Sequence, residues 1–339
     1  MSERILIVAE ISANHGNDIN IVKDSIAKAK EIGCDAVKIQ TYKPDTITID
    51  CDNEYFRLDT GTIWDGRVLY NLYEEAYMPW EWHEELFEYA RSIDFTLFST
   101  PFDNTAVDIL EKCGNPIYKI ASFEITDIPL IRYAASKGKP MIISTGIATE
   151  QEIRDAVEAC HAEGNEDVCI LKCTSEYPAK IEDANIMTMC DMAERFGCDA
   201  GLSDHTLGSD VPMVAASLGA KVIEKHFILD RSIGGPDSSF SMDPEQFGEM
   251  VEKIRNVEKI KGNVTYEITE KKKKSRKYAR SLFVVEDVKA GDTVTEENVR
   301  SIRPSAGLAP KMYFDVLGMK FTKDVSKGTP LSEDIIEEK

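Results

Sequence analysis

The sequence predicts a (β/α)8 TIM barrel followed by a small, separate C-terminal domain. Eight short apolar runs alternate with amphipathic stretches through about the first 260 residues. The runs are apolar on both faces, which is typical of parallel strands buried between a core and a layer of helices. A doubly wound open sheet is the alternative, but no GxGxxG motif follows the first strand, which favours the barrel.

The elements of the barrel are predicted from periodicity and from helix-start signals. An acid or serine followed by an early proline marks a helix start in Asp127-Ile128-Pro129 and in Ser209-Asp210-Val211-Pro212. The predicted helices include residues 21–32, 82–91, 105–113, 128–137, 149–161 and 185–196. The predicted strands are residues 5–10, 36–40, 95–99, 117–121, 141–144, 169–173, 200–203 and 222–226.

Composition excludes several classes of protein. A net charge of −20 over 339 residues argues against nucleic acid or an anionic membrane as the main partner. No apolar run is long enough to span a bilayer and no signal-peptide pattern opens the chain, so we expect a soluble, cytoplasmic protein. The eight cysteines lack CxxC spacing, and Cys169 and Cys173 lie in an apolar run, so we expect reduced core residues rather than metal ligands.

Two histidines end neighbouring predicted strands. His205 follows Ser203-Asp204, and His226 follows Glu224-Lys225. Two imidazoles at the carboxyl ends of successive strands suit a first-row metal ion at the mouth of the barrel. One such histidine alone is more readily explained as structural, and the pair is what indicates a metal site.

Two lysines are predicted to point into the barrel near the same strand ends. Lys38 and Lys119 are costly to bury unless each meets an anion, which indicates a bound phosphate or carboxylate. The alternative is that each lysine pairs with a nearby protein carboxylate such as Glu10 or Glu224. Serine and threonine hydroxyls at other strand ends would serve the same anion as neutral donors, and they occur at Ser99, Thr100, Ser122, Ser144, Thr145, Thr174, Ser175 and Ser203.

Five motifs, in this order along the chain, resemble those of the sialic acid synthases. They are the segments 7–16 (IVAEISANHG), 98–103 (FSTPFD), 118–122 (YKIAS), 203–206 (SDHT) and 224–227 (EKHF). The resemblance extends over nearly the whole chain. It implies a TIM-barrel enzyme that condenses phosphoenolpyruvate with an amino-sugar aldehyde to make a nonulosonic acid.

The resemblance also implies roles for individual residues. His205 and His226 would hold Mn²⁺ or Mg²⁺, and Glu124 would be the general acid or base. Glu10 and Asp237 would contact sugar hydroxyls or transfer protons, with the alternative that each only orients a lysine or a ligand histidine. The residues implied to bind phosphoenolpyruvate are Lys38, Thr100, Lys119, Ser122, Ser144, Ser175 and Ser203, and those implied to bind the sugar are Asn14, His15, Arg67 and Arg303.

Within this family the chain most resembles the pseudaminic acid synthases, in residues 61–67 (GTIWDGR), 121–124 (ASFE) and 234–241 (GGPDSSFS). Synthases of N-acetylneuraminate usually have Ala-Ser-Gly-Glu where this chain has residues 121–124, and Gly-Pro-Asp-His where it has residues 235–238. Phe123 and Ser238 are therefore departures that indicate a different sugar. The expected acceptor is 2,4-diacetamido-2,4,6-trideoxy-altrose. Legionaminic acid or N-acetylneuraminate synthesis, and less readily another phosphoenolpyruvate-dependent keto-acid synthase, are the alternatives. A non-enzymatic sugar-binding protein would not need buried lysines beside a metal.

The C-terminal segment differs in character from the barrel. Four lysines at 271–274 interrupt an acidic chain, and they predict an exposed helix end in a linker over residues 263–279, after a barrel domain of residues 1–262. Residues 280–339 alternate short strands with turns and resemble the antifreeze-like SAF domain, a β-clip fold. In the family this domain covers the active site of the other subunit, which implies a domain-swapped homodimer in which Arg303 acts in trans.

Other polar and aromatic residues allow two interpretations. Trp64, Asp65, Arg67 and Tyr70, after the second strand, either line the sugar pocket or form a packed surface loop. His83 and His161 fall in helical patterns, and we expect them at the surface or in an interface.

Overall fold

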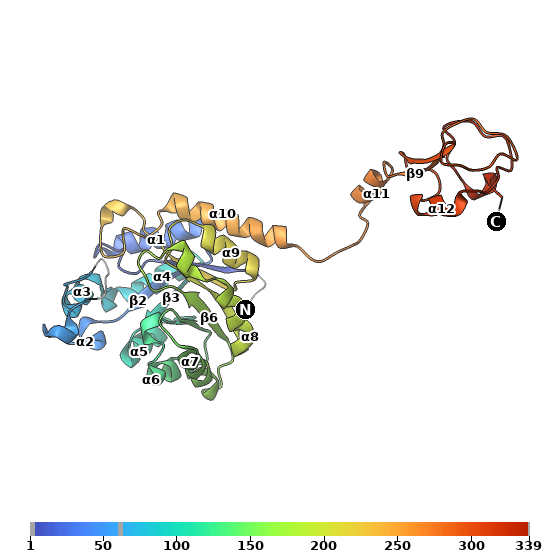
Figure 1. Cartoon of the computed structure of the whole chain (residues 1–339). Helices are drawn as coiled ribbons and strands as arrows, with labels where there is room; N and C mark the ends of the chain where they lie inside the picture. The colour runs from blue at the N-terminus through green and yellow to red at the C-terminus, as the bar shows by residue number, and fades with distance from the viewer. Residues whose placement is uncertain (1–3, 60–63, 338–339) are drawn as a thin grey trace. The chain divides into compact units, whose positions relative to one another are not determined.

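The computed structural model describes residues 4–59 and 64–337 and divides the chain into two compact units (Figure 1). The first unit is Met1–Gly262 and the second is Asn263–Lys339. Three residues of the GTIWDGR segment, Gly61, Thr62 and Ile63, lie outside the described residues. Among the residues that are described, no helix has the length and apolar character needed to cross a bilayer.

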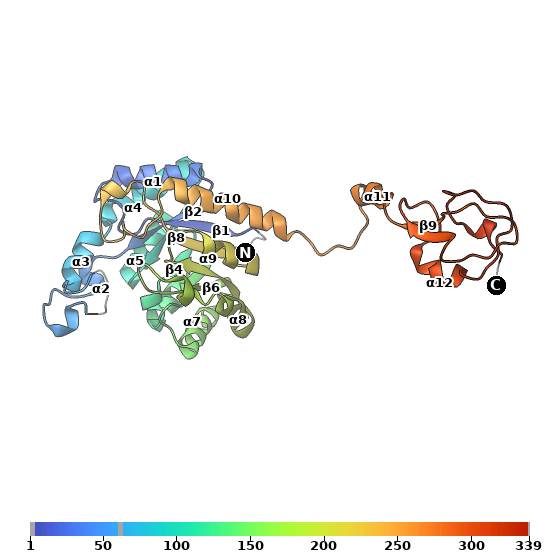
Figure 2. The same cartoon turned by 45° about the horizontal axis from the view of Figure 1, so that its top comes forward.

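The first unit is a closed barrel of eight parallel strands in sequential order, which confirms the predicted fold class and excludes the open sheet. Helices surround the strands, as both views of the molecule show (Figure 2). The observed strand ends lie within two residues of the predicted ones. The strands are β1 (Leu6–Glu10), β2 (Ala36–Thr41), β3 (Thr96–Pro101), β4 (Tyr118–Ile120), β5 (Met141–Ser144), β6 (Val168–Cys173), β7 (Asp199–Asp204) and β8 (Val222–His226).

Both helix starts that the sequence marks precede a helix, and side-chain caps are present at some of the outer helices. The Asp127 side chain accepts a hydrogen bond from the backbone N–H of Leu130, and Thr149 forms a capping box with Glu152. Ser209 precedes a helix as predicted, but its hydroxyl makes no cap bond and instead accepts one from Lys253. The outer helices are α1 (Ile19–Glu31), α4 (His83–Ser92), α5 (Asn104–Cys113), α6 (Ile128–Ala135), α7 (Glu150–Ala162), α8 (Met187–Phe196), α9 (Asp210–Leu218) and α10 (Pro244–Lys261).

The interior of the barrel has an apolar layer beneath a polar one. The apolar layer contains Val8, Ala36, Phe98, Ile142 and Val222, each at most 1% exposed. Side chains alternate between the two faces of a strand, so the residue two positions further on points to the same side. Applied to those five positions, this rule gives a second layer nearer the carboxyl ends of the strands, made of Glu10, Lys38, Thr100, Ser144 and Glu224.

His83 is a correction to the prediction of a surface or interface residue. It is the first residue of α4 and is fully buried. Its Nε2 lies 2.8 Å from the hydroxyl of Thr41, and its Nδ1 lies 3.3 Å from the carbonyl of Pro79. Burial lowers the pKa of His83 to about 4. The helical pattern identified the element correctly, but the side chain faces the strands. His161 is at the surface, as predicted.

The insertion after β2 carries two helices that we do not predict from the sequence pattern, α2 (Pro44–Ile47) and α3 (Leu69–Ala76). Arg57 and Val68 form an isolated antiparallel bridge within it. Helix α3 buries one face, with Leu72 8% exposed. The insertion is therefore packed structure, and it lies at the carboxyl end of the barrel because it follows the carboxyl end of a strand.

The second unit has its own small core. Strands β9 (Ser281–Val284) and β10 (Val299–Ile302) pair antiparallel, and isolated bridges such as Phe283 with Pro330 add further short strand-like contacts. Buried apolar residues around them include Leu282, Val299 and Phe321. Lys271–Lys274 lie in the exposed helix α11 (Glu270–Arg276), and α12 (Tyr313–Val316) lies between β10 and the C-terminus.

Candidate functional site

Four charged side chains are packed together inside the barrel, and we call them the charged floor: Glu10, Lys38, Lys119 and Glu224. Each residue is 5% exposed or less. Lys38 Nζ lies 2.7 Å from Glu10 Oε2 and 3.4 Å from Glu224 Oε1. Lys119 Nζ lies 3.8 Å from Glu224 Oε1. The two lysines therefore pair with Glu10 and Glu224, as in the predicted alternative.

The two carboxylates of the charged floor have different electrostatic environments. Burial raises the pKa of Glu10, and Lys38 only partly offsets that effect. Burial also raises the pKa of Glu224, but the ammonium groups of Lys119 and Lys38 outweigh it, so its pKa is lowered. Burial lowers the pKa of Lys119. Glu224 is thus stabilised as an anion, whereas burial makes Glu10 easier to protonate than an ordinary carboxyl group.

Hydroxyl groups from other strands surround the two lysines. Lys38 Nζ donates to Thr100 Oγ1 at 3.2 Å, and Lys119 Nζ donates to Ser144 Oγ at 2.7 Å. Ser203 Oγ lies 3.5 Å from Glu224 Oε1. These contacts bring together the lysines and three of the hydroxyl residues predicted to bind phosphoenolpyruvate.

The remaining two predicted serines lie around Gly146. The backbone N–H of Gly146 donates to Ser122 Oγ at 3.1 Å. A Cβ atom at position 146 would lie 2.1 Å from Ser175 Oγ and 2.9 Å from Ser122 Oγ. Only glycine permits this approach of three loops, because any side chain would overlap the hydroxyl groups.

The predicted metal ligands are close together. The ring centroids of His205 and His226 are 5.3 Å apart. His205 Nδ1 donates to the carbonyl of Thr174 at 2.9 Å, which leaves its Nε2 as the nitrogen with a lone pair in the neutral ring. His226 Nδ1 is buried with no hydrogen-bond partner among the described residues, and it lies 3.8 Å from Asp237 Oδ2. Burial, followed by the charge of His205, lowers the pKa of His226 well below its usual value.

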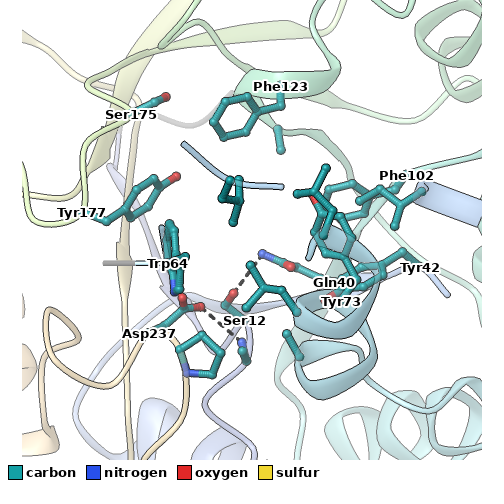
Figure 3. A pocket seen from close by; sticks show the side chains of 18 of the residues that line it. Ser12, Gln40, Tyr42, Trp64, Tyr73, Phe102, Phe123, Ser175, Tyr177 and Asp237 are labelled. Carbon is teal, nitrogen blue, oxygen red and sulfur yellow. Dashed lines mark hydrogen bonds between the residues drawn. The ribbon is translucent and has the colours of Figure 1, made fainter. Parts of the chain in front are cut away.

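A cavity of about 440 Å³ opens beside the charged floor. Gln40 connects the two, because it lines the cavity and its Nε2 donates to Glu10 Oε1 at 3.2 Å. Most of the lining is apolar. Five rings, which we call the aromatic wall, lie on opposite sides of the cavity (Figure 3): Trp64 and Tyr177 face Tyr42, Tyr73 and Phe102.

Two carboxylates line this cavity, as the resemblance implies for a catalytic site. Burial raises the pKa of Glu124 to about 7, and Lys119 offsets only part of that effect. Burial also raises the pKa of Asp237, which accepts the backbone N–H of Ala13 at 3.4 Å. A carboxyl group with a pKa near neutrality can take or give a proton under ordinary conditions, which suits Glu124 to acid–base chemistry.

The predicted sugar-binding residues are not among those that line the cavity. Asn14 is fully buried, and its amide donates to the Phe227 carbonyl at 3.0 Å and to Ser241 Oγ at 2.8 Å. His15 packs edge-on against Trp82, and Arg67 pairs with Glu75 at 2.5 Å. Arg303 belongs to the second unit. In the first unit these contacts favour a positioning role for Asn14 over direct sugar binding.

Sequence reasoning missed most of the aromatic wall. Tyr177 is the clearest case, because its ring centroid lies 4.2 Å from that of His205 and 5.4 Å from that of Trp64. Its place four residues after β6, at the carboxyl end of the barrel, is a signal that could have identified it. Tyr73 lies in α3, and its role depends on a helix that the pattern does not reveal.

Comparisons with known proteins show the family to which the chain belongs. Residues 25–266 match the NeuB family, and residues 279–337 match the SAF domain. A pseudaminic acid synthase of Helicobacter pylori is 49% identical over 98% of this chain and 97% of its own length. An N,N'-diacetyllegionaminic acid synthase of Legionella pneumophila is 36% identical over 98% of this chain and 94% of its own. A crystal structure of an N-acetylneuraminic acid synthetase from Leptospira borgpetersenii has a TM-score of 0.71 and 29% identity, and covers 80% of this chain and 90% of that one.

Proposed function

The chain belongs to the NeuB family, and we propose that it is a pseudaminic acid synthase. It condenses phosphoenolpyruvate and water with 2,4-diacetamido-2,4,6-trideoxy-altrose to give pseudaminic acid and phosphate. The observation that carries the proposed chemistry is the pair of buried lysines, Lys38 and Lys119, beside two histidines at the mouth of an aromatic cavity. The identity of 45–49% to relatives named pseudaminic acid synthase supports the choice of sugar.

Phosphoenolpyruvate binds at the charged floor. Its phosphate and carboxylate replace Glu10 as partners of Lys38 and engage Lys119, while Thr100, Ser144 and Ser203 add neutral donors. Burying two ammonium groups is costly without anionic partners. The lysines therefore pair with protein carboxylates before phosphoenolpyruvate binds and with its phosphate and carboxylate afterwards. Ser122 and Ser175, held together at Gly146, are placed to donate to the far end of the same ligand.

The residues present fit a divalent metal ion. Among the described residues no group of three or more His, Cys, Asp or Glu side chains could hold a metal. The residues that would hold it are His205 and His226, whose ring centroids lie 5.3 Å apart, and water and substrate would complete its ligands. The unpartnered Nδ1 of His226 and the orientation of His205 by Thr174 suit this arrangement. Bound there, Mn²⁺ or Mg²⁺ would supply Lewis acidity toward the sugar aldehyde oxygen.

The reaction itself needs one new carbon–carbon bond and one proton acceptor. C3 of phosphoenolpyruvate attacks the aldehyde carbon, and C2 takes on cationic character. Water adds at C2 while Glu124 removes one of its protons and returns a proton to the former aldehyde oxygen, which becomes a hydroxyl group. The tetrahedral intermediate then releases phosphate as the C2–O bond to phosphate breaks, and its remaining C2 hydroxyl proton passes to the phosphate and leaves the C2 ketone. Glu124 is suited to this role because its raised pKa of about 7 lets it both accept and return a proton. The buried Lys38 and Lys119 hold the phosphate that leaves.

The sugar occupies the cavity above the floor. A trideoxy diacetamido sugar presents methyl groups, and the aromatic wall offers them apolar faces. Ser12, Gln40 and Asp237 lie between the two groups of rings at one end of the cavity (Figure 3), where they supply the polar contacts for hydroxyl and acetamido groups.

A second copy of the chain completes the site. Five apolar side chains that follow different strands of the barrel are 50–60% exposed: Ile49, Phe123, Ile147, Ile181 and Leu207. Because each of them follows a strand, all five lie at the carboxyl end of the barrel, which is the end that a second copy would cover. In the second unit Arg303 lines a hollow together with Lys271, Lys272 and Arg276. The dimer brings this basic face over the partner's cavity, where Arg303 reaches the sugar.

Phosphate release from phosphoenolpyruvate, measured with Mn²⁺ and three sugars, tests the proposal. The sugars are the altrose-configured diacetamido sugar, its 2,4-diacetamido-2,4,6-trideoxy-mannose isomer and N-acetylmannosamine. We expect release with the altrose sugar alone, and loss of activity on removal of the metal by a chelator. Preference for the mannose isomer would instead favour legionaminic acid synthesis, the activity named for the Legionella pneumophila relative. Release with none of the three, in folded and metal-loaded protein, would contradict the synthase assignment.

A further inference from the structure

A second buried ion pair lies directly beside the two histidines, on the opposite face of the strands from the charged floor. Lys225 Nζ lies 2.5 Å from Asp204 Oδ2, and both side chains are 2% exposed. Asp204 and Lys225 are also direct register partners across strands β7 and β8. The proposed mechanism makes no use of either residue.

The ammonium group of Lys225 bonds to both residues that flank His205. Besides the Asp204 carboxylate, it donates to the backbone carbonyl of Thr206. Asp204 Oδ1 in turn accepts the backbone N–H of Thr206 at 3.1 Å and its hydroxyl at 2.9 Å. We call Asp204, Thr206 and Lys225 the clamp. In the clamp, Lys225, which directly precedes His226, holds the residues on both sides of His205.

The clamp faces the helix layer rather than the barrel interior. Glu224 points inward, since it contacts Lys38 and Lys119, so its neighbour Lys225 points to the other face of β8. The backbone of His205 is held from a third direction, because its carbonyl accepts the N–H of Ala179 at 3.0 Å. Each contact restrains the position of the His205 ring relative to His226 without touching either ring.

We propose that the clamp is a positioning device that sets the separation and orientation of His205 and His226, and thereby the affinity of the site for a divalent metal. The inference rests on the proposed function in assigning both histidines to the metal. A site with only two protein ligands depends strongly on their alignment, because there is no third side chain to compensate for a misplaced ring. Outer contacts of this kind typically change metal affinity by about 10–100-fold.

The amino end of the barrel offers a matched control. Arg255 pairs with Asp35, which accepts the N–H of Ile7 at 2.8 Å, and Arg255 Nη1 donates to the carbonyl of Ile5 at 2.9 Å. This ion pair also holds strand backbone. It lies at the start of β1, whereas His226 is the last residue of β8 and His205 directly follows β7, at the opposite end of the barrel.

Three full-length variants test the clamp: Lys225→Met, Asp204→Asn/Lys225→Met and Arg255→Met. Lys225→Met leaves the Asp204 carboxylate buried and unpaired, so it should lower both thermal stability and Mn²⁺ affinity. The double variant removes that charge and should recover stability, but it lacks the bridge to Thr206. We expect its Mn²⁺ affinity to stay about 10–100-fold below wild type, measured by electron paramagnetic resonance titration of metal-free protein. Arg255→Met should lose stability and keep wild-type affinity.

A second readout needs no metal. The chain has five histidines, so ¹⁵N-histidine spectra of the metal-free protein can report each ring. In the double variant the signals of His205 and His226 should shift or broaden, whereas those of His15, His83 and His161 should not. Affinity that recovers together with stability, or unchanged histidine signals, would overturn the clamp. If wild-type protein binds no Mn²⁺, the metal assignment of the proposed function fails, and the histidine spectra decide the clamp by themselves.

Discussion

The charged floor and the aromatic wall lie side by side in one site, yet they are built in different ways. Glu10, Lys38, Lys119 and Glu224 all lie in barrel strands, where neighbouring backbones fix each side chain. The rings of the wall come from loops and from α3. The barrel strands hold the charged side chains that bind phosphoenolpyruvate in fixed positions. The loops and α3 can change the shape of the sugar cavity without disturbing those strands.

The two regions also differ in what holds them together. The floor is a network of ion pairs with its members 1–5% exposed, so removal of one charge leaves another buried and unpaired. The wall is held by ring contacts such as Trp64 with Tyr177 at 5.4 Å. Loss of one ring there removes contact area and leaves no buried charge. Substitutions in the floor should therefore affect chemistry and folding together, and substitutions in the wall should affect sugar binding.

The largest effect is expected at Glu124, where floor and wall meet. Glu124→Gln removes the proton acceptor and should lower kcat by about 10²–10⁴-fold with little change in either KM. Phosphate release under saturating substrates measures it. A variant that keeps more than a tenth of wild-type kcat would assign the proton transfer to another residue.

Glu124 should also leave a signature in the pH dependence of stability. Burial raises its pKa from 4.5 to about 7, so the folded protein binds this proton more tightly than the unfolded chain does. Its contribution to the free energy of unfolding is full below pH 4.5 and is lost as pH rises through 7. Relative to wild type, substrate-free Glu124→Gln should therefore gain about 1–3 kcal/mol between pH 4.5 and pH 8, measured by urea unfolding.

Glu111 provides the control of opposite sign. Burial raises its pKa, but hydrogen bonds from Lys139 and Tyr118 outweigh that effect and lower it. Its contribution to stability is present above its unfolded pKa and is lost in acid. Glu111→Gln should therefore be less stable than wild type at pH 8 and approach it as pH falls. Parallel pH profiles for Glu124→Gln and Glu111→Gln would contradict the raised pKa of Glu124.

The next largest effect is expected in the charged floor. Lys38→Met should raise KM for phosphoenolpyruvate by about 10²–10³-fold, because an anion loses its buried ammonium partner. It should also destabilise the fold, because Glu10 loses its partner at 2.7 Å. Lys38→Met/Glu10→Gln should recover stability but not activity. Lys139→Met, which breaks a partly exposed pair with Glu111, should leave KM unchanged. A KM within threefold of wild type in Lys38→Met would exclude Lys38 as an anion ligand.

The smallest effect is expected at the edge of the wall. Phe123 lines the cavity but is 60% exposed. Phe123→Ala should raise KM for the sugar by about tenfold, since partial burial of an aromatic ring against a ligand contributes about 1.4 kcal/mol. KM for phosphoenolpyruvate should not change. Tyr55→Ala, an exposed residue of the insertion outside the cavity, is the matched control. An equal effect on the two KM values would contradict a contact of Phe123 with the sugar alone.

The amino-acid sequence by itself determined the barrel and its charged interior. Eight short runs that are apolar on both faces are enough to identify parallel strands, because a strand buried on both faces needs apolar residues throughout. Alternation along those strands then places Lys38, Lys119 and the two histidines at one end. The five motifs identify the family by their resemblance to those of the sialic acid synthases, and each of them begins in a barrel strand.

Only the tertiary structure decided which groups meet. Glu10 and Glu224 as partners of the lysines, Asn14 as a support for the loop after β8, and Lys225 as a bridge around His205 all depend on contacts between distant segments. His83 shows the limit most clearly, because a helical pattern does not reveal which of its polar residues faces the strands. Local periodicity follows from neighbouring residues, whereas these contacts follow from packing of the whole barrel.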